Sequence, residues 1–322
     1  MRMPVRLALA FSLAGVLPAA AQVYRSGVDL VRLNVVVTDN RGFVRGLGPE
    51  DFEVLEDGRP QRIELFVAGR REPGAATGAP DPAGGGTDGQ ADLGPLRLGL
   101  LFDASGSMQE DIKFARTAAV KFMNALPEAA DVTFVDFDTE VRIARYGPAD
   151  FARLVERIRS RKAGGWTALY DAIGVYLHGA SDLDGEKVFV LYTDGGDTRS
   201  SMDYGELLDL LKASDITMYA IGLLEHQSAF ARSDQRMRLQ QMAAATGGLA
   251  FFPLGPSQLE EMYARIVDEI RSRYTIGYVS TNRRADGGWR RVEVRVTRRG
   301  LKGLRVRTRP GYYALYREPA GR

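Results

Sequence analysis

The sequence predicts an α/β fold: a doubly wound, mostly parallel sheet covered by helices, flanked by N- and C-terminal β segments that form a β-sandwich. Short apolar runs alternate with helical periods between residues 98 and 272, as they do where helices connect parallel strands. Residues 28–70 and 273–316 show strand periods instead. We therefore expect the two ends of the chain to build one domain, with the α/β domain inserted between them.

The chain starts with a predicted signal peptide over residues 1–21. Two arginines within Met1–Arg6 precede the apolar stretch Leu7–Leu17, and Ala19–Ala21 supplies the small residues of a cleavage site before Gln22. A retained membrane anchor is the alternative, but this apolar stretch is short for a bilayer. No later stretch is apolar enough to span a membrane. We expect an exported protein, periplasmic or secreted, with no integral membrane span after signal cleavage.

Residues 28–70 are predicted to form paired strands. Large aliphatic residues occupy every second position in Val31–Val37, which is the period of a half-buried strand. Asp57-Gly58 is a tight-turn signal between a strand that begins at Phe52 and a partner strand at Ile63–Val67. This block is small for an independent domain.

A flexible linker is predicted over residues 71–97. Residues 73–86 are rich in Gly, Pro and Ala and contain no aromatic and no large aliphatic residue. Such a segment cannot bury enough apolar surface to offset the entropy of ordering it.

Between residues 98 and 272, five short apolar runs are predicted strands. They are Leu98–Phe102, Val132–Phe137, Val188–Tyr192, Ile216–Ile221 and Leu249–Phe252. Apolar residues spaced by three and four positions predict helices over Ile112–Leu126, Leu154–Ile158, Leu207–Leu211 and Leu259–Ile270. The alternation predicts a parallel sheet with helices on both faces.

After residue 273 the strand period returns, and the segment is strongly basic. Residues 281–310 hold eleven Arg or Lys against two acids, although the whole chain has a net charge of +2. These side chains could bind anionic polysaccharide, lipid head groups or nucleic acid. They could instead form the solvated face of strands, where charge discourages edge-to-edge pairing. Trp289 is the only aromatic residue among the arginines, too few for a stacking platform, so we expect no nucleic-acid partner.

Three separated pieces predict one metal site. Asp103-Ala104-Ser105-Gly106-Ser107 ends one apolar run, Thr167 opens a predicted helix after Gly164-Gly165, and Asp194 ends another run. The carboxyl ends of parallel strands meet at a shared crevice, so these side chains are expected to converge. The predicted ligands are Asp103, Ser105, Ser107, Thr167 and Asp194. This all-oxygen set suits Mg²⁺, with Mn²⁺ and Ca²⁺ as alternatives. Taken singly, each Ser or Thr could instead be a helix cap.

The α/β part resembles the von Willebrand factor type A (VWFA) domain. Three segments carry the resemblance: Asp103–Ser107, Gly165–Asp171 and Leu191–Gly195. They look like the three parts of that family's metal-ion-dependent adhesion site. The resemblance implies direct Mg²⁺ binding by the hydroxyls and water-mediated binding by the two acids. It also implies one coordination position for a Glu or Asp carboxylate of a partner protein.

The flanking segments extend this likeness. Val31–Phe66, Tyr274–Tyr278 and Arg309–Tyr313 are similar to segments of bacterial secreted proteins with a VWFA-related domain. Trp166 departs from the usual pattern, since a small residue is frequent beside the Thr. We expect Trp166 to pack in the core; the alternative is that it borders the site and contacts a partner. Asp197 is expected to be a solvated loop residue, and Asp171 a structural hydrogen bonder.

Several enzyme classes find no support. The absence of cysteine excludes disulfides, thiolate metal sites and cysteine nucleophiles. His178 and His226 are the only histidines, and no nucleophile elbow, phosphate-binding loop or His-Glu-x-x-His motif is present. The sequence therefore predicts a metal-dependent adhesion or assembly module rather than an enzyme. The alternatives are a structural protein with a vestigial metal site, a metal-dependent hydrolase, and an adaptor for AAA+ ATPases, against which the signal peptide argues.

Overall fold

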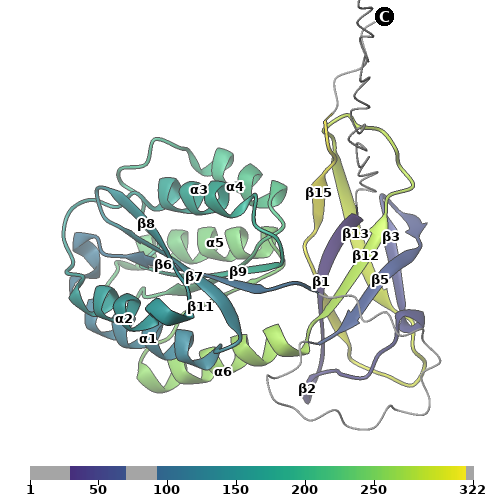
Figure 1. Ribbon diagram of the computed structural model, residues 1–322, viewed down its shortest axis with the longest axis horizontal. Helices are drawn as coiled ribbons and strands as arrows, with labels where there is room; N and C mark the ends of the chain where they lie inside the picture. The colour runs from purple at the N-terminus through teal and green to yellow at the C-terminus, as the bar shows by residue number, and fades with distance from the viewer. Residues whose placement is uncertain (1–29, 70–92, 317–322) are drawn as a thin grey trace, which may run out of the picture.

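The computed structural model describes residues 30–69 and 93–316. Figure 1 shows two parts, a helix-rich part around one sheet and a smaller part built from strands. The expected α/β fold class, with flanking N- and C-terminal β segments, is confirmed. The predicted signal peptide and most of the predicted linker lie outside the described residues.

The larger part is organised around a six-stranded sheet. In spatial order its strands are β11 (Leu249–Phe251), β10 (Thr217–Gly222), β9 (Glu186–Thr193), β6 (Leu96–Asp103), β7 (Ala129–Phe137) and β8 (Val141–Tyr146). All neighbours pair in parallel except β7 and β8, which are antiparallel. Every residue of β9 is buried, which is typical of a strand with helices on both faces.

Six helices cover this sheet, three on each face (Figure 1). One face carries α1 (Ile112–Ala125), α2 (Phe151–Ser160) and α6 (Pro256–Ser272), and the other carries α3 (Leu169–Ala180), α4 (Tyr204–Ala213) and α5 (Ala229–Ala245). Two short 3-10 helices, η2 (Gly106–Gln109) and η3 (Pro148–Asp150), precede α1 and α2. None of these helices is long and apolar enough to cross a membrane, within the residues that the structure describes.

The winding of the sheet reverses between β6 and β9. From β6 the chain moves outward to β7, and from β9 it moves outward in the opposite direction to β10. The helix after β6 packs on one face and the helix after β9 on the other. The carboxyl ends of these two strands therefore mark the topological switch point, where α/β folds bind ligands.

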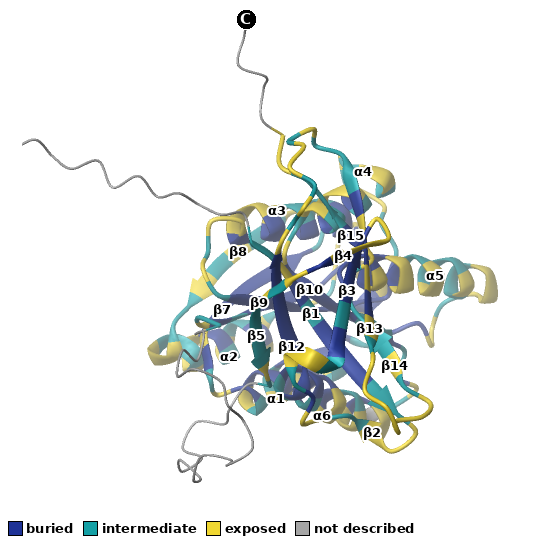
Figure 2. Ribbon diagram, turned by 90° about the vertical axis from the view of Figure 1, so that its right-hand side faces the viewer, coloured by how far each residue is buried: buried dark blue, intermediate teal, exposed yellow. Residues whose placement is uncertain are grey.

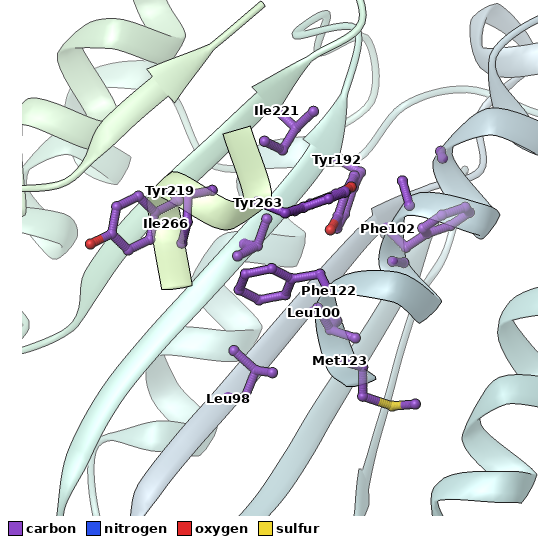
Figure 3. Close-up of a cluster of buried hydrophobic side chains, with 14 of the residues drawn as sticks. Leu98, Leu100, Phe102, Phe122, Met123, Tyr192, Tyr219, Ile221, Tyr263 and Ile266 are labelled. Carbon is purple, nitrogen blue, oxygen red and sulfur yellow. The ribbon is translucent and has the colours of Figure 1, made fainter. Parts of the chain in front are cut away.

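The core under α1 and α6 is large and aromatic (Figure 3). Phe122 of α1 and Tyr263 of α6 place their ring centroids 5.5 Å apart. Phe102 and Tyr192, from β6 and β9, lie beneath them with fully buried side chains. Each such side chain stabilises the fold by about 1.5–3 kcal/mol relative to an exposed one, so the two strands that end at the switch point are firmly held.

The smaller part consists of two antiparallel sheets. The first contains β14 (Arg305–Arg307), β1 (Leu30–Asp39), β12 (Tyr274–Val279) and β5 (Ile63–Ala68), with β2 (Gly42–Phe43) on the end of β1. The second contains β15 (Gly311–Tyr313), β13 (Trp289–Val296), β3 (Phe52–Glu56) and β4 (Arg59–Gln61); η1 (Pro49–Asp51) precedes β3. Strand β1 pairs with β12 from Leu30↔Val279 to Val35↔Tyr274. The two ends of the chain thus share one apolar core.

Burial differs between the six-stranded sheet and the antiparallel sheets: strand β9 of the former is buried along its whole length, whereas β13 of the latter is buried on one face (Figure 2). Along β13 buried and exposed residues alternate, because one face meets the core and the other meets water. Of the three arginines of this strand, Arg291 and Arg295 occupy exposed positions, whereas Arg290 is buried.

The two parts are joined by α6 and by buried polar contacts. Helix α6 runs into β12, where the Arg273 guanidinium forms an ion pair with the Glu186 carboxylate of β9. Both side chains are buried. Nearby, Asn34 Nδ2 donates to Thr217 Oγ1 at 3.2 Å. These contacts fix the strand domain against the amino ends of β9 and β10.

Several elements differ from expectation. Strands β4 and β8 and helix α5 were not predicted, and β6 begins at Leu96 rather than Leu98. The expected pairing of Ile63–Val67 with the strand that begins at Phe52 is wrong: β3 pairs with β4 across the Asp57-Gly58 turn, and β5 pairs with β12 in the other sheet. Helix α5 buries Leu239, Met242, Ala243 and Ala245, all in its second half, so its sequence carries a weak apolar stripe. Ser107 lies in η2, and α1 begins at Ile112 with Asp111 as its N-cap, so Ser107 does not cap α1.

Candidate functional site

The three predicted segments meet at the carboxyl edge of the sheet. Asp103 is the last residue of β6, and Thr193, before Asp194, is the last residue of β9. The loop after β6 binds the loop before α3 through two backbone hydrogen bonds, from Gly106 N to Gly165 O (3.0 Å) and from Gly164 N to Ala104 O (2.9 Å). A side chain at Gly106 would place its Cβ 3.2 Å from Gly165 O, so the glycine permits this close approach.

Asp103 is the most buried acid of the site. Its side chain is fully shielded from solvent. One carboxylate oxygen accepts from Ser105 N (2.9 Å) and the other from the Thr193 hydroxyl (2.6 Å). Burial and, secondarily, the charge of Asp194 raise the pKa of Asp103 from 3.8 to about 7, although these hydrogen bonds act in the opposite direction.

Asp194 is held at the start of the loop after β9. Its Oδ2 accepts from Gln227 Nε2 at 2.8 Å, and its Oδ1 accepts from Gly196 N at 3.3 Å. Asp194 is only 2% exposed. Among the described residues no cationic side chain forms an ion pair with Asp103 or Asp194, so two buried carboxylates lie at this edge with neutral partners.

The hydroxyl groups lie beside these acids. Ser105 Oγ and Ser107 Oγ are 3.1 Å apart; Ser105 is buried, whereas Ser107 is exposed. Thr167 is 4% exposed and is fixed through its backbone. Its N–H donates to Thr198 Oγ1 (2.9 Å), and its carbonyl accepts from the N–H groups of Thr198 and Arg199. The loop after Asp194 thereby positions the loop that carries Thr167.

Two further acids near the site have structural partners. Asp171 accepts from the N–H groups of Ser201 (2.9 Å) and Met202 (3.1 Å), as expected of a structural hydrogen bonder. Asp197 was expected to be a solvated loop residue, but its carboxylate accepts from Tyr170 N (3.0 Å) and from the Ser200 hydroxyl (2.6 Å). Asp197 therefore caps the N-terminus of α3 from another loop, where a negative charge is favourable.

The expected core position of Trp166 is wrong. Trp166 is 64% exposed, and its backbone N–H donates to Thr139 Oγ1 at 2.9 Å. It adjoins Thr167 in the chain, so it borders the candidate site.

Sequence reasoning missed the residues that hold the acids in place. Thr193, Gln227 and Thr198 contact Asp103, Asp194 and Thr167 through side-chain atoms. Only Thr193 carried a sequence signal, since it directly precedes Asp194. Gln227 belongs to the loop after β10, and nothing local to it indicates a partner 33 residues away.

The donor set is made of hydroxyls as well as acids. No group of three or more His, Cys, Asp or Glu side chains suited to a metal occurs in residues 30–69 and 93–316. His178 lies on α3, and His226, which adjoins Gln227 in the loop after β10, has its Nδ1 3.4 Å from Glu110 Oε2. Five oxygen-bearing side chains at one edge match the preference of a hard divalent cation, and the two uncompensated acids supply the charge that would attract it.

Many of the basic residues of the C-terminal segment pair with acids. Arg290 is buried and bonds to Asp286 at 2.7 Å. Arg295 lies 2.7 Å from Glu293. Arg298 lies 3.4 Å from Asp51. This pairing favours the interpretation of the segment as charged strand faces over a general polyanion-binding patch.

Comparison with known proteins places this geometry in a family. Residues 98–265 match the von Willebrand factor type A domain. No curated protein matches the chain. Among solved structures, the chain is similar to the vWF domain of the type V pili tip protein Mfa5 from Porphyromonas gingivalis. The identity is 12%, the TM-score is 0.46, and the match covers 55% of this chain and 95% of that one.

Two other solved structures are similar at the same level. The pilus adhesin SpaC from Lactobacillus rhamnosus GG, in its open conformation, shows 10% identity and a TM-score of 0.47, with 84% of this chain and 49% of that chain covered. A von Willebrand factor type A protein from Catenulispora acidiphila shows 15% identity and a TM-score of 0.43, covering 70% and 67%. The present chain thus spans about half the length of SpaC. Because the family match extends over more than half of the sequence, the chain belongs to the von Willebrand factor type A domain family.

Proposed function

We propose that this chain is an exported, metal-dependent protein-binding module that acts in adhesion or assembly. In this proposal Asp103, Ser105, Ser107, Thr167 and Asp194 hold a Mg²⁺ ion. When bound, the ion supplies a positive charge that can accept a Glu or Asp carboxylate from a partner protein. The chain's own residues supply the binding site and its rigidity, and no catalytic group is assigned.

One observation carries the proposal: two buried acids at the switch point have only neutral hydrogen-bond partners. Asp103 is bonded to a backbone N–H and a hydroxyl, and Asp194 to an amide and a backbone N–H. Burying charge without a compensating charge is costly, so a cation at this position would relieve both acids at once. The adjacent hydroxyls of Ser105 and Ser107 provide neutral oxygens for the same ion.

The electrostatic balance of the set suits a recognition role. Two acids reduce the charge of a divalent ion without adding a third or fourth negative ligand. The remaining ligands are neutral hydroxyls, so a bound ion keeps an attraction for an incoming carboxylate. The exposed position of Ser107 lies on the side open to such a group.

The first test is calorimetric titration of the chelator-stripped protein with Mg²⁺ and Mn²⁺. The parent protein is expected to bind one equivalent, and Ser107→Ala and Thr167→Ala to weaken binding at least about tenfold. Ser201→Ala is the matched control, because Ser201 is also an exposed loop serine and its hydroxyl is outside the donor set. Equal Mg²⁺ affinity in the parent, Ser107→Ala and Thr167→Ala proteins would remove the assignment.

The second test concerns the partner's carboxylate. The end-capped peptide acetyl-Gly-Glu-Gly-amide is titrated into the protein with excess Mg²⁺, and acetyl-Gly-Gln-Gly-amide serves as the control that has no carboxylate. Binding of the Glu peptide alone, abolished by chelation, is the expected result. Metal binding without any preference for the Glu peptide would favour a structural or assembly role in which the cation stabilises the fold.

A further inference from the structure

A second candidate binding site lies between the two parts of the molecule, away from the metal site. Here a cavity of about 770 Å³ opens between the end of α4 and the strand domain. Strand β15 lies beside α4 (Figure 1). Asp215 on its wall precedes β10, so the cavity is at the amino end of the parallel strands. The metal site is at their carboxyl end. A cavity of this size is within the range of sites that hold a small organic ligand.

The walls of the cavity are largely apolar. Its lining includes Val31, Val279, Tyr312, Tyr313 and Leu315. Val279 and Leu315 are 38% and 56% exposed, which is unusual for aliphatic side chains that share one depression. The tyrosine hydroxyls are engaged elsewhere: Tyr312 donates to Glu56 at 2.7 Å, and Tyr313 donates to Asp209 at 3.0 Å. These tyrosines therefore contribute apolar ring surface rather than hydroxyl groups to the cavity.

Two arginines without acidic partners line the same cavity. Arg283 and Arg284 are exposed, and no acid of residues 30–69 or 93–316 lies within ion-pair distance of either. The buried Glu56 carboxylate nearby accepts from the Ser280 and Tyr312 hydroxyls, and two other acids pair with other cations. Asp286 bonds to Arg290 at 2.7 Å, and Asp215, on the cavity wall, bonds to Lys187 Nζ at 2.9 Å. The cavity therefore carries a net positive charge.

The loop that carries these arginines is held in place. Thr281 N donates to Gln61 Oε1 at 2.9 Å, and the Ser280 hydroxyl donates to the buried Glu56 carboxylate. The Arg284 carbonyl accepts from Arg290 at 3.1 Å. A loop with these anchors has little backbone freedom to lose on binding.

From these features we propose that the cavity binds a single-chain amphiphilic anion of the fatty-acid class. The apolar walls receive the hydrocarbon chain, and Arg283 and Arg284 receive the carboxylate. Guanidinium groups bind carboxylates through paired hydrogen bonds, which suits them to this end of the ligand. The proposal is independent of metal binding, because the two sites lie at opposite ends of the sheet.

Three probes separate the contribution of the ligand's hydrocarbon chain from that of its charge. Dodecanoate, dodecyltrimethylammonium and acetate are titrated calorimetrically into the full mature protein below micelle-forming concentrations. Dodecanoate is expected to bind at one site. The cationic probe has the same chain and should bind at least about tenfold more weakly because two arginines repel it. Acetate lacks the chain and should bind more than about 100-fold more weakly.

Variants locate the site. The double variant Arg283→Gln/Arg284→Gln should weaken dodecanoate binding about fivefold or more. Arg299→Gln/Arg305→Gln is the matched control, since both arginines are exposed and lie outside the cavity. Leu315→Asp should also weaken binding, because it places a negative charge beside the ligand. Leu210→Asp, an exposed leucine on α4 outside the lining, should leave binding unchanged.

Trp289 offers a second readout. Its ring centroid is 5.0 Å from that of Tyr313, which lines the cavity. In a Trp166→Phe background Trp289 is the only tryptophan, so its fluorescence should change with dodecanoate at the calorimetric midpoint. Absence of dodecanoate binding overturns the proposal. Equal affinity for the anionic and cationic probes does the same, as does unchanged affinity in the Arg283→Gln/Arg284→Gln protein.

Discussion

Replacing Asp103 by Asn should stabilise the metal-free protein and abolish metal binding at the same time. Asp103 is fully buried, and burial together with the charge of Asp194 raises its pKa to about 7. Asn has nearly the same shape and no charge. It therefore removes the desolvation cost and the repulsion, and it also removes one of the two acids that would attract the ion.

The size of this effect follows from the pKa. A value of about 7 against 3.8 is a difference of about three units, and each unit corresponds to about 1.4 kcal/mol. Ionised Asp103 therefore costs the folded state about 4 kcal/mol at pH 8, as an upper limit. Asn has a single acceptor oxygen, so it keeps a weaker hydrogen bond from either Ser105 N or the Thr193 hydroxyl and loses the other, at a cost of about 1–2 kcal/mol. We expect a net stabilisation of about 2 kcal/mol at pH 8.

The effect has a definite pH dependence. Between pH 3.8 and 7 the folded chain keeps a proton on Asp103 that the unfolded chain has lost. The free energy of unfolding of the parent therefore falls by about 1.4 kcal/mol per pH unit as pH rises through this window, and it levels off above it. The Asn variant has no such proton. The advantage of the variant over the parent should consequently grow from pH 5 to pH 7.

Urea denaturation in chelator, at pH 5, 6, 7 and 8, measures this difference. Asp182→Asn is the control for loss of one negative charge, because Asp182 is exposed and far along the chain from the site. Excess Mg²⁺ should raise the stability of the parent at pH 8 and leave Asp103→Asn unchanged. A pH-independent difference between parent and variant, or a variant that is less stable at pH 8, would refute the reasoning.

Three further changes test other parts of the structure. Arg273→Ala removes the ion pair between Arg273 and the buried Glu186 carboxylate and should lower the free energy of unfolding by about 3–5 kcal/mol in urea denaturation; a cost below about 1 kcal/mol would contradict the structural role of this pair. Asp171→Ala removes the acceptor for the N–H groups of Ser201 and Met202 and should lower the free energy of unfolding by about 1–3 kcal/mol in urea denaturation. Its Mg²⁺ affinity, measured by calorimetry, should fall much less than that of Thr167→Ala. Trp166→Ala should change stability by no more than about 0.5 kcal/mol in thermal unfolding, because the side chain is 64% exposed; a larger loss would mean that the indole packs on the core.

Much of the fold could be predicted because its signals are local. The runs ending at Phe102 and Thr193 are continuous and apolar, as strands buried on both faces must be, and the structure has β6 and β9 there. The helices with clear apolar spacing, α1 and α6, were predicted close to their observed bounds. Helix α5 was missed because only part of its length contacts the sheet, so its apolar residues do not form a continuous stripe.

For the candidate site, too, some features could be predicted from the sequence and others depend on tertiary packing. Asp103 and Asp194 could be predicted at strand ends because each directly follows a continuous apolar run in the sequence. Their burial, and the raised pKa of Asp103, come from how neighbouring strands and helices close over them. The hydrogen bonds from Thr193 and Gln227 arise from packing and could not be read from spacing.

By itself, the sequence predicted most of the strands and helices in their order, the β segments that flank the α/β part, and five oxygen-bearing residues as candidate ligands. The spacing of apolar residues and the position of a residue at a strand end depend on neighbours in the sequence, so both can be predicted without a structure. Only the tertiary structure decided that Trp166 lies at the surface, that Asp197 caps α3, and that Arg273 pairs with Glu186 between the two parts. Each of these depends on which distant segments pack together, and burial and charge pairing are properties of that packing.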